Sequence, residues 1–107
     1  MKIRDREIRT IYDLLDLVRE RPGMWISEPS LSFLDVFLFG FSAGVLAAGA
    51  SFEPEHPRFH DFHAWIATRL NRKMNGRGWR NLLLDECGSE PAALERFWIE
   101  LDAFRGR

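Results

Sequence analysis

Three histidines lie within eight positions of one another and are the first candidates for chemistry. His60 and His63 are three residues apart, so they share a face if this segment is helical. His56 precedes them and could fold back to complete a metal site with a nearby carboxylate. The spacing lacks the specificity of an HExxH helix. The sequence therefore favours a solvated helix start, and we expect no metal or other cofactor.

The single cysteine, Cys87, is the next candidate. One cysteine cannot form an internal disulfide or a thiolate zinc cage, which fits a reducing, cytoplasmic compartment. A Cys–His nucleophile pair is conceivable, but a lone cysteine at a helix end is typically a small packed residue. No GxSxG motif is present. We therefore expect no catalytic residues and a protein that is not an enzyme.

Charge is more informative, because the net charge of −1 hides two separate runs. The basic run contains no acid and consists of Arg69, Arg72, Lys73, Arg77 and Arg80. The acidic run contains only one cation and consists of Asp85, Glu86, Glu90, Glu95, Glu100 and Asp102.

Several interpretations of these runs remain open. They could be ordinary solvated faces. The acidic run could mimic nucleic acid and dock on a basic toxin or nuclease, with complementary charge raising the association rate. The basic turn NRKMNGRGWR could hold a phosphate backbone while Trp79 stacks on a base, although five cations make a weak nucleic-acid footprint. The two runs could also support self-association, including a homodimer.

The elements that position these residues read as helices throughout. No segment shows the alternation of a strand, and 107 residues suffice for one domain with its own core. We therefore expect an all-α fold, a single helical domain over residues 1–107 arranged as a compact bundle of about five helices. The expected helices cover 7–21, about 30–50, 58–72, 79–86 and 89 to the end.

Capping residues mark several helix ends. Thr10 and Asp13 form a capping pair if the first helix begins there. Pro22 and the glycine after it stop that helix. Ser89 caps the last helix, with Pro91 tolerated in its first turn.

An uncharged apolar run, residues 36–50, dominates the second helix. It is shorter than the roughly 18–20 residues that span a bilayer, so we expect a buried central helix and no membrane association. Gly40 and Gly44 fall near one helix face. Each glycine costs about 1 kcal/mol relative to alanine in a helix interior, so we expect another backbone to pack closely there.

Trp25 follows the first helix in the run VRERPGMWI. It either packs in the core and pins this loop or remains partly exposed as a protein-binding anchor. The run resembles the ATPase subunits of type II DNA topoisomerases. Their site needs an acidic residue and an Asn on the following helix, whereas FLDVFLFGFSAGV offers only Asp35 and no Gly-rich phosphate motif is present. Only the turn is shared.

A longer resemblance covers almost the whole chain through RPGMWI, LSFLDVFLFGF, FHDFHAWIATRL, GWRNLLL and SEPAALERFWIELDAF. These motifs resemble a group of small, mostly uncharacterised bacterial proteins. The resemblance implies an immunity protein of the kind encoded beside polymorphic toxins, and it supplies no catalytic residues. We therefore expect a cytoplasmic inhibitor that occludes a toxin through its acidic run and Trp25. The alternative is a nucleic-acid-binding accessory protein that uses the basic turn.

Overall fold

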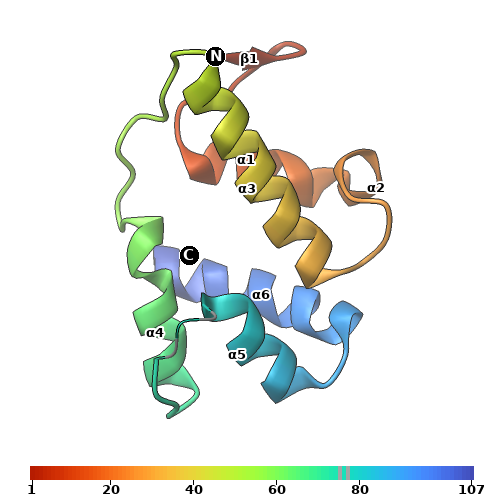
Figure 1. Ribbon diagram of the computed structural model, residues 1–107, viewed down its shortest axis with the longest axis vertical. Helices are drawn as coiled ribbons and strands as arrows, with labels where there is room; N and C mark the ends of the chain where they lie inside the picture. The colour runs from red at the N-terminus through yellow and green to blue at the C-terminus, as the bar shows by residue number, and fades with distance from the viewer. Residues whose placement is uncertain (75, 77) are drawn as a thin grey trace.

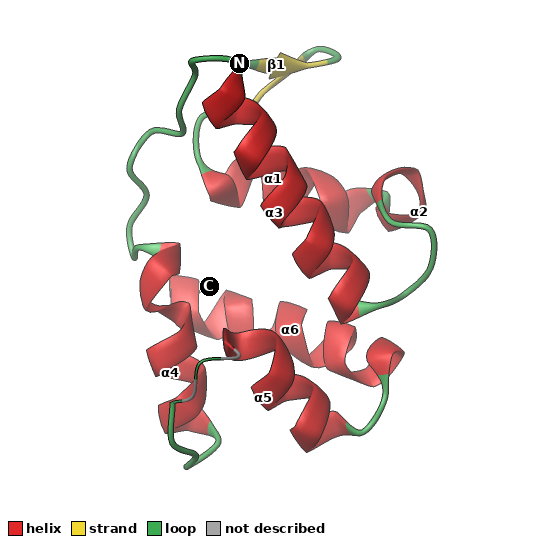
Figure 2. Cartoon of the chain, in the orientation of Figure 1, coloured by secondary structure: helices red, strands yellow, loops and turns green. Residues whose placement is uncertain are grey.

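The structure, a computed structural model, describes residues 1–74, 76 and 78–107. Helices dominate it, as the sequence predicts (Figures 1 and 2). A short hairpin and helices α1 to α3 form one half of the molecule, and helices α4 to α6 form the other. In chain order the elements are β1 (Lys2–Ile3), β2 (Arg6–Glu7), α1 (Ile11–Glu20), α2 (Pro22–Trp25), α3 (Leu31–Ala47), the 3-10 turn η1 (Phe59–Asp61), α4 (Phe62–Arg69), α5 (Gly78–Cys87) and α6 (Glu90–Arg105).

The predicted caps are confirmed. The Thr10 hydroxyl accepts a hydrogen bond from the Asp13 amide at 3.3 Å, and the Asp13 carboxylate accepts one from the Thr10 amide at 3.0 Å. Helix α6 begins after Ser89, whose hydroxyl accepts from the Ala92 amide. Gly88, between α5 and α6, has a φ of 80°, a conformation that glycine adopts without strain.

Two features near the N-terminus differ from the sequence prediction. Lys2–Ile3 pairs antiparallel with Arg6–Glu7, although no strand was expected. Strands of two residues are too short to show an alternating pattern, so periodicity does not detect them. The proline and glycine after α1 do stop that helix, but Pro22–Trp25 then forms a helical turn of its own. Proline suits this first position because it has no amide hydrogen to leave unpaired.

The core between α4, α5 and α6 is built around Phe62, which is completely buried. Its ring stacks on Phe59 at 5.5 Å and meets Phe97 and Phe104 edge-on at 5.5 and 5.3 Å. Aromatic rings of this size contribute large apolar areas and favour such offset and edge-to-face geometries.

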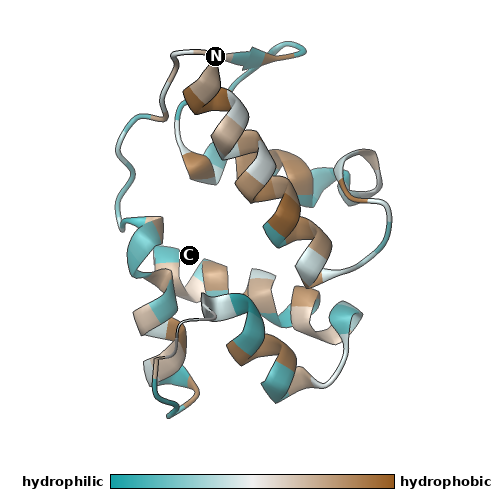
Figure 3. Cartoon of the chain, in the orientation of Figure 1, coloured by the Kyte–Doolittle hydropathy of each residue, from teal (hydrophilic) through white to brown (hydrophobic). Residues whose placement is uncertain are grey.

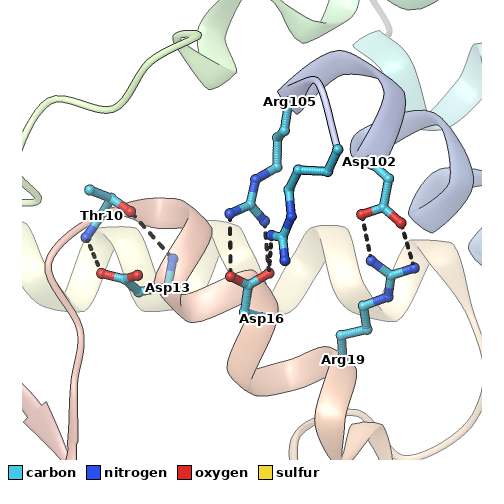
Figure 4. A network of polar contacts seen from close by, with 7 residues as sticks. Thr10, Asp13, Asp16, Arg19, Asp102 and Arg105 are labelled. Atoms are coloured by element: carbon cyan, nitrogen blue, oxygen red, sulfur yellow. Dashed lines mark hydrogen bonds and ion pairs between the residues drawn. The ribbon is translucent and has the colours of Figure 1, made fainter.

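Paired charges join α1 to α6 at the other side of the core (Figure 4). The Arg19 guanidinium donates to both oxygens of Asp102 at 2.7 and 3.0 Å. Arg105 donates to both oxygens of Asp16 at 2.7 and 3.3 Å and lies over the Tyr12 ring at 4.5 Å. Two-point contacts of this kind fix orientation as well as distance, so they align the first helix with the last.

Helix α3 is not the buried central helix that the sequence predicts. Leu31, Leu34 and Leu38 are buried against the rest of the chain. On the opposite side, Val36 and Phe39 are 69% and 80% exposed. The error has a physical reason: α3 packs on α5 and α6 along one side only, and no described segment covers its other side. None of the helices in the described residues has both the length and the apolar content needed to cross a bilayer.

Two phenylalanines provide a direct stability test of this arrangement. We expect Phe62→Ala to lower the free energy of unfolding by about 3–5 kcal/mol, because it empties a buried site. We expect Phe39→Ala to change it by no more than about 0.5 kcal/mol, because an exposed side chain contributes little packing. Urea unfolding of both variants measures the difference. If Phe39→Ala lowered the free energy of unfolding as much as Phe62→Ala, the outer side of α3 would be covered within the single chain.

Candidate functional site: the outer face of helix α3

Two ion pairs join the basic run to the acidic run. Glu100 is only 2% exposed, and it accepts hydrogen bonds from Arg69 at 2.9 Å and Arg96 at 3.0 Å. Arg72 forms an ion pair with Asp85 at 3.5 Å. Helix α4 and the turn after it therefore bring the basic run against α5 and α6, which carry the acidic run. Much of the charge that looked available for a partner is used within the chain.

The other acidic residues divide into two groups. Glu90 binds the start of α3, and Asp102 binds Arg19. Glu86 and Glu95 are exposed and form no ion pair with any described residue. Among the residues predicted to form an acidic face, Glu86 and Glu95 are therefore the two that are exposed and have no ion pair with a described residue.

Burial and hydrogen bonds act in opposite directions on the pKa values of these carboxyl groups. Burial tends to raise the pKa of Glu100, but the hydrogen bonds from its two arginines outweigh burial and hold the pKa below its usual value. The pKa of Asp102 is lowered mainly by its hydrogen bonds from Arg19. Both groups therefore remain charged and engaged at neutral pH.

The basic run is likewise only partly available. Arg80 lies 3.3 Å from the Asp35 carboxylate and donates to the Ser32 hydroxyl at 3.0 Å. Lys73 is exposed. Arg77 lies outside the described residues. Trp79, proposed to stack on a base, packs instead against Phe97 at 4.9 Å.

The histidines and the cysteine form no evident reactive centre. In the part of the chain that the structure describes, no three His, Cys, Asp or Glu side chains are placed to hold a metal ion together. The imidazole of His63 is half-buried, while His56 and His60 are exposed. Burial raises the pKa of the Cys87 thiol, which disfavours the nucleophilic thiolate.

Trp25 is neither fully buried nor fully exposed. Its ring packs against Phe37 of α3 at 6.1 Å, so it does connect the RPGM turn to the core. It also lines a surface hollow of about 290 Å³ beside the first half of α3. The packing agrees with the interpretation that Trp25 pins this turn to the core, and its use as a protein-binding anchor stays a prediction.

The surface that the sequence prediction missed is the outer side of α3. Figure 3 shows α3 coloured mostly white to brown, as a predominantly hydrophobic helix. The residues of the outer side recur every three or four positions and so lie on one helix face. All of them are exposed to solvent, with Leu46 at 78% and Phe33 at 41%. We call this surface the α3 outer face and define it as Phe33, Val36, Phe39, Gly40, Ala43, Leu46 and Ala47.

No residue of the α3 outer face is charged. Asp35, the one charged residue of α3, is paired with Arg80 beside this face. Burial raises the pKa of Asp35, and the nearby Arg80 opposes that shift. Exposed apolar patches of about 400 Å² or more on a folded protein mark binding surfaces. The α3 outer face can bind an apolar surface, and it holds no group that could perform acid–base or nucleophilic chemistry.

Comparisons with family models, with curated proteins and with solved structures gave no match to this chain.

One interaction fixes α3, and therefore its outer face, in place. The Glu90 carboxylate accepts hydrogen bonds from the Ser32 amide at 2.9 Å, the Ser32 hydroxyl at 2.6 Å and the Ser30 hydroxyl at 3.2 Å. A carboxylate at a helix N-terminus also complements the helix dipole. Partial burial tends to raise the pKa of Glu90, but these hydrogen bonds outweigh it and lower the pKa.

Replacing this carboxylate gives a pH-dependent prediction. We expect Glu90→Gln to lower the free energy of unfolding at pH 7 by about 2 kcal/mol, because hydrogen bonds to a charged acceptor are lost. The pKa of Glu90 is lowered in the folded protein, so the stabilisation is complete above the ordinary pKa of a glutamate and is lost as the pH falls through the lowered pKa. Urea unfolding from pH 7 to pH 3 should therefore show a shallower acid loss in the variant.

The matched control is Glu95→Gln, a change of the same kind at an exposed position of α6. It should alter neither the stability at pH 7 nor the acid dependence appreciably. If the Glu90 and Glu95 variants behave alike, Glu90 does not anchor α3.

Proposed function

We propose that this protein acts by binding another protein through the α3 outer face. The observation that carries the proposal is the exposure of three large apolar side chains, Val36, Phe39 and Leu46, on one uncharged helix face. A helix laid into an apolar groove, or against another helix, is a common mode of protein recognition. Covering these side chains removes apolar area from water, which is the main favourable term in protein association.

The specific form that we propose is an immunity-type inhibitor, which binds a bacterial toxin and blocks its site by occlusion. Support comes from the sequence resemblance and from a surface suited to binding without chemistry. In this proposal the α3 outer face provides the affinity. Glu86 and Glu95, which form no ion pair within the described part of the chain, would steer a basic toxin toward the complex, since exposed charges act mainly on the association rate.

The nucleic-acid alternative has less support. Counterion release requires cations that are free to neutralise phosphates. Arg69, Arg72 and Arg80 are all engaged with carboxylates. It remains a prediction of the sequence, and no observation in the described residues favours it over protein binding.

A charge placed on the α3 outer face tests the proposed function. We expect affinity-tagged wild-type protein to retain a stoichiometric protein partner from the lysate of its native host. We expect Phe39→Glu to lose that partner, because complex formation would bury an unpaired carboxylate. Quantitative mass spectrometry of the eluates, with circular dichroism to verify folding, measures the loss.

The control is Ile99→Glu, which makes the same kind of change at another exposed apolar residue. Ile99 is 56% exposed on α6. The Ile99→Glu variant should keep the partner bound. Retention of the partner by the Phe39 variant, or equal loss in both variants, would contradict binding through the α3 outer face.

A further inference from the structure

A hollow of about 360 Å³ opens between the N-terminal hairpin, the end of α1 and helix α2. Three different elements provide its apolar lining, which consists of Ile3, Leu17, Met24 and Trp25. Met24 is 45% exposed, and the other three side chains are partly buried. Pockets that bind small molecules begin at about 300 Å³ and combine an apolar lining with a few polar groups. The hollow therefore has the size and the lining of a site for a small organic molecule.

Three arginines and two carboxylates also line this hollow. Arg6 forms an ion pair with Glu20, which joins the hairpin to the end of α1. Arg4 and Arg21 are exposed and form no ion pair or side-chain hydrogen bond with any residue that the structure describes. Arg21 is close enough to Glu20 to help lower the pKa of that carboxyl, but the carboxylate is already bound to Arg6. Even with Asp5 included, the hollow keeps an excess of one positive charge.

The backbone of Arg4 is held in an unfavourable conformation. Ile3 pairs with Arg6, so Arg4 and Asp5 form the two-residue turn of the hairpin. The φ of Arg4 is 56°, in the left-handed region where such turns favour glycine or asparagine. Strained residues that persist in a fold cluster at binding and active sites. An arginine at this turn position is accounted for if its side chain acts at the hollow.

We propose that this hollow binds a small apolar carboxylate. The apolar body of the ligand packs on Leu17 and Trp25, and its carboxylate is bound by Arg4 and Arg21. Arginine suits this role because its planar guanidinium donates two parallel hydrogen bonds to one carboxylate. The inference is independent of the proposed function, because no residue of the α3 outer face lines this hollow.

A matched series of probes tests the class of ligand. The compounds 3-phenylpropionate, 3-phenylpropanol and 3-phenylpropylamine share one apolar body and differ in charge. Titrations of the isotope-labelled protein, followed by NMR chemical shifts, measure their dissociation constants. We expect the acid to bind about fivefold more tightly than the alcohol or the amine, because only the acid pairs with the two arginines.

The same spectra locate the probe. The backbone amides of Leu17 and Met24 and the indole N–H of Trp25 should shift on addition of the acid. Equal affinity for the three compounds, or shifts confined to residues outside the hollow, would overturn the proposal.

Substitutions at the arginines test their role. Arg4→Gly and Arg21→Gln should each weaken binding of the acid about threefold and leave binding of the alcohol unchanged. Met24→Ala should weaken the acid and the alcohol alike, because it removes apolar contact only. Arg4→Gly gives the turn a residue that it favours, so the midpoint of its thermal unfolding should be no lower than that of the wild type. Loss of binding in this variant is then not a loss of folding.

Asp5→Asn provides a test of opposite sign. Removing this carboxylate from the hollow should strengthen binding of the acid about twofold, a gain that damage to the hairpin would not produce. Arg58→Gln is the control, because Arg58 is exposed, does not line the hollow and forms no ion pair within the described part of the chain. The control should bind the acid as the wild type does. Unchanged affinity in both the Arg4 and Arg21 variants, or an equal loss in the Arg58 variant, would overturn the proposal.

Discussion

The position of α3 depends on the Glu90 carboxylate. Glu90 is the first residue of α6, and it binds the amide and hydroxyl of Ser32 together with the hydroxyl of Ser30. These groups start α3, so one side chain joins the N-termini of two helices. The first turns of α3 are then held on the core through Leu31 and Leu34. The opposite side of the helix points into solvent, because none of the described elements lies over it.

Ion pairing within the chain engages several residues of the two charge runs, among them Arg69, Arg72 and Arg80. Glu100 is buried, and it is tolerated there because Arg69 and Arg96 both donate to it. Removing one partner of such a group costs more than the pair itself contributes, so these contacts maintain orientation rather than supply large net stability. The binding surface that we propose is therefore chosen for the exposed apolar area of the α3 outer face and not for its charge.

Much of the fold follows from local sequence signals. Thr10, Ser89 and Gly88 mark helix ends through chemistry that acts within a few residues, so these boundaries were predictable. The burial of α3 was not, because an uninterrupted apolar run shows no periodicity to indicate which side faces the core. Nor could sequence separation reveal that Arg69 meets Glu100, since that pairing depends on how α4 packs against α6. The surface that we propose for binding lies where tertiary packing, and not the local sequence pattern, decides which side chains are exposed.

The central claim is that the α3 outer face is uncovered in the single chain. Carbene footprinting at concentrations below 1 µM, read out residue by residue by mass spectrometry, tests it most directly. We expect heavy labelling of Val36, Phe39 and Leu46, with Leu34 and Phe62 protected. Protection of Phe39 equal to that of Phe62 would show that the chain covers this face itself, and would contradict the account.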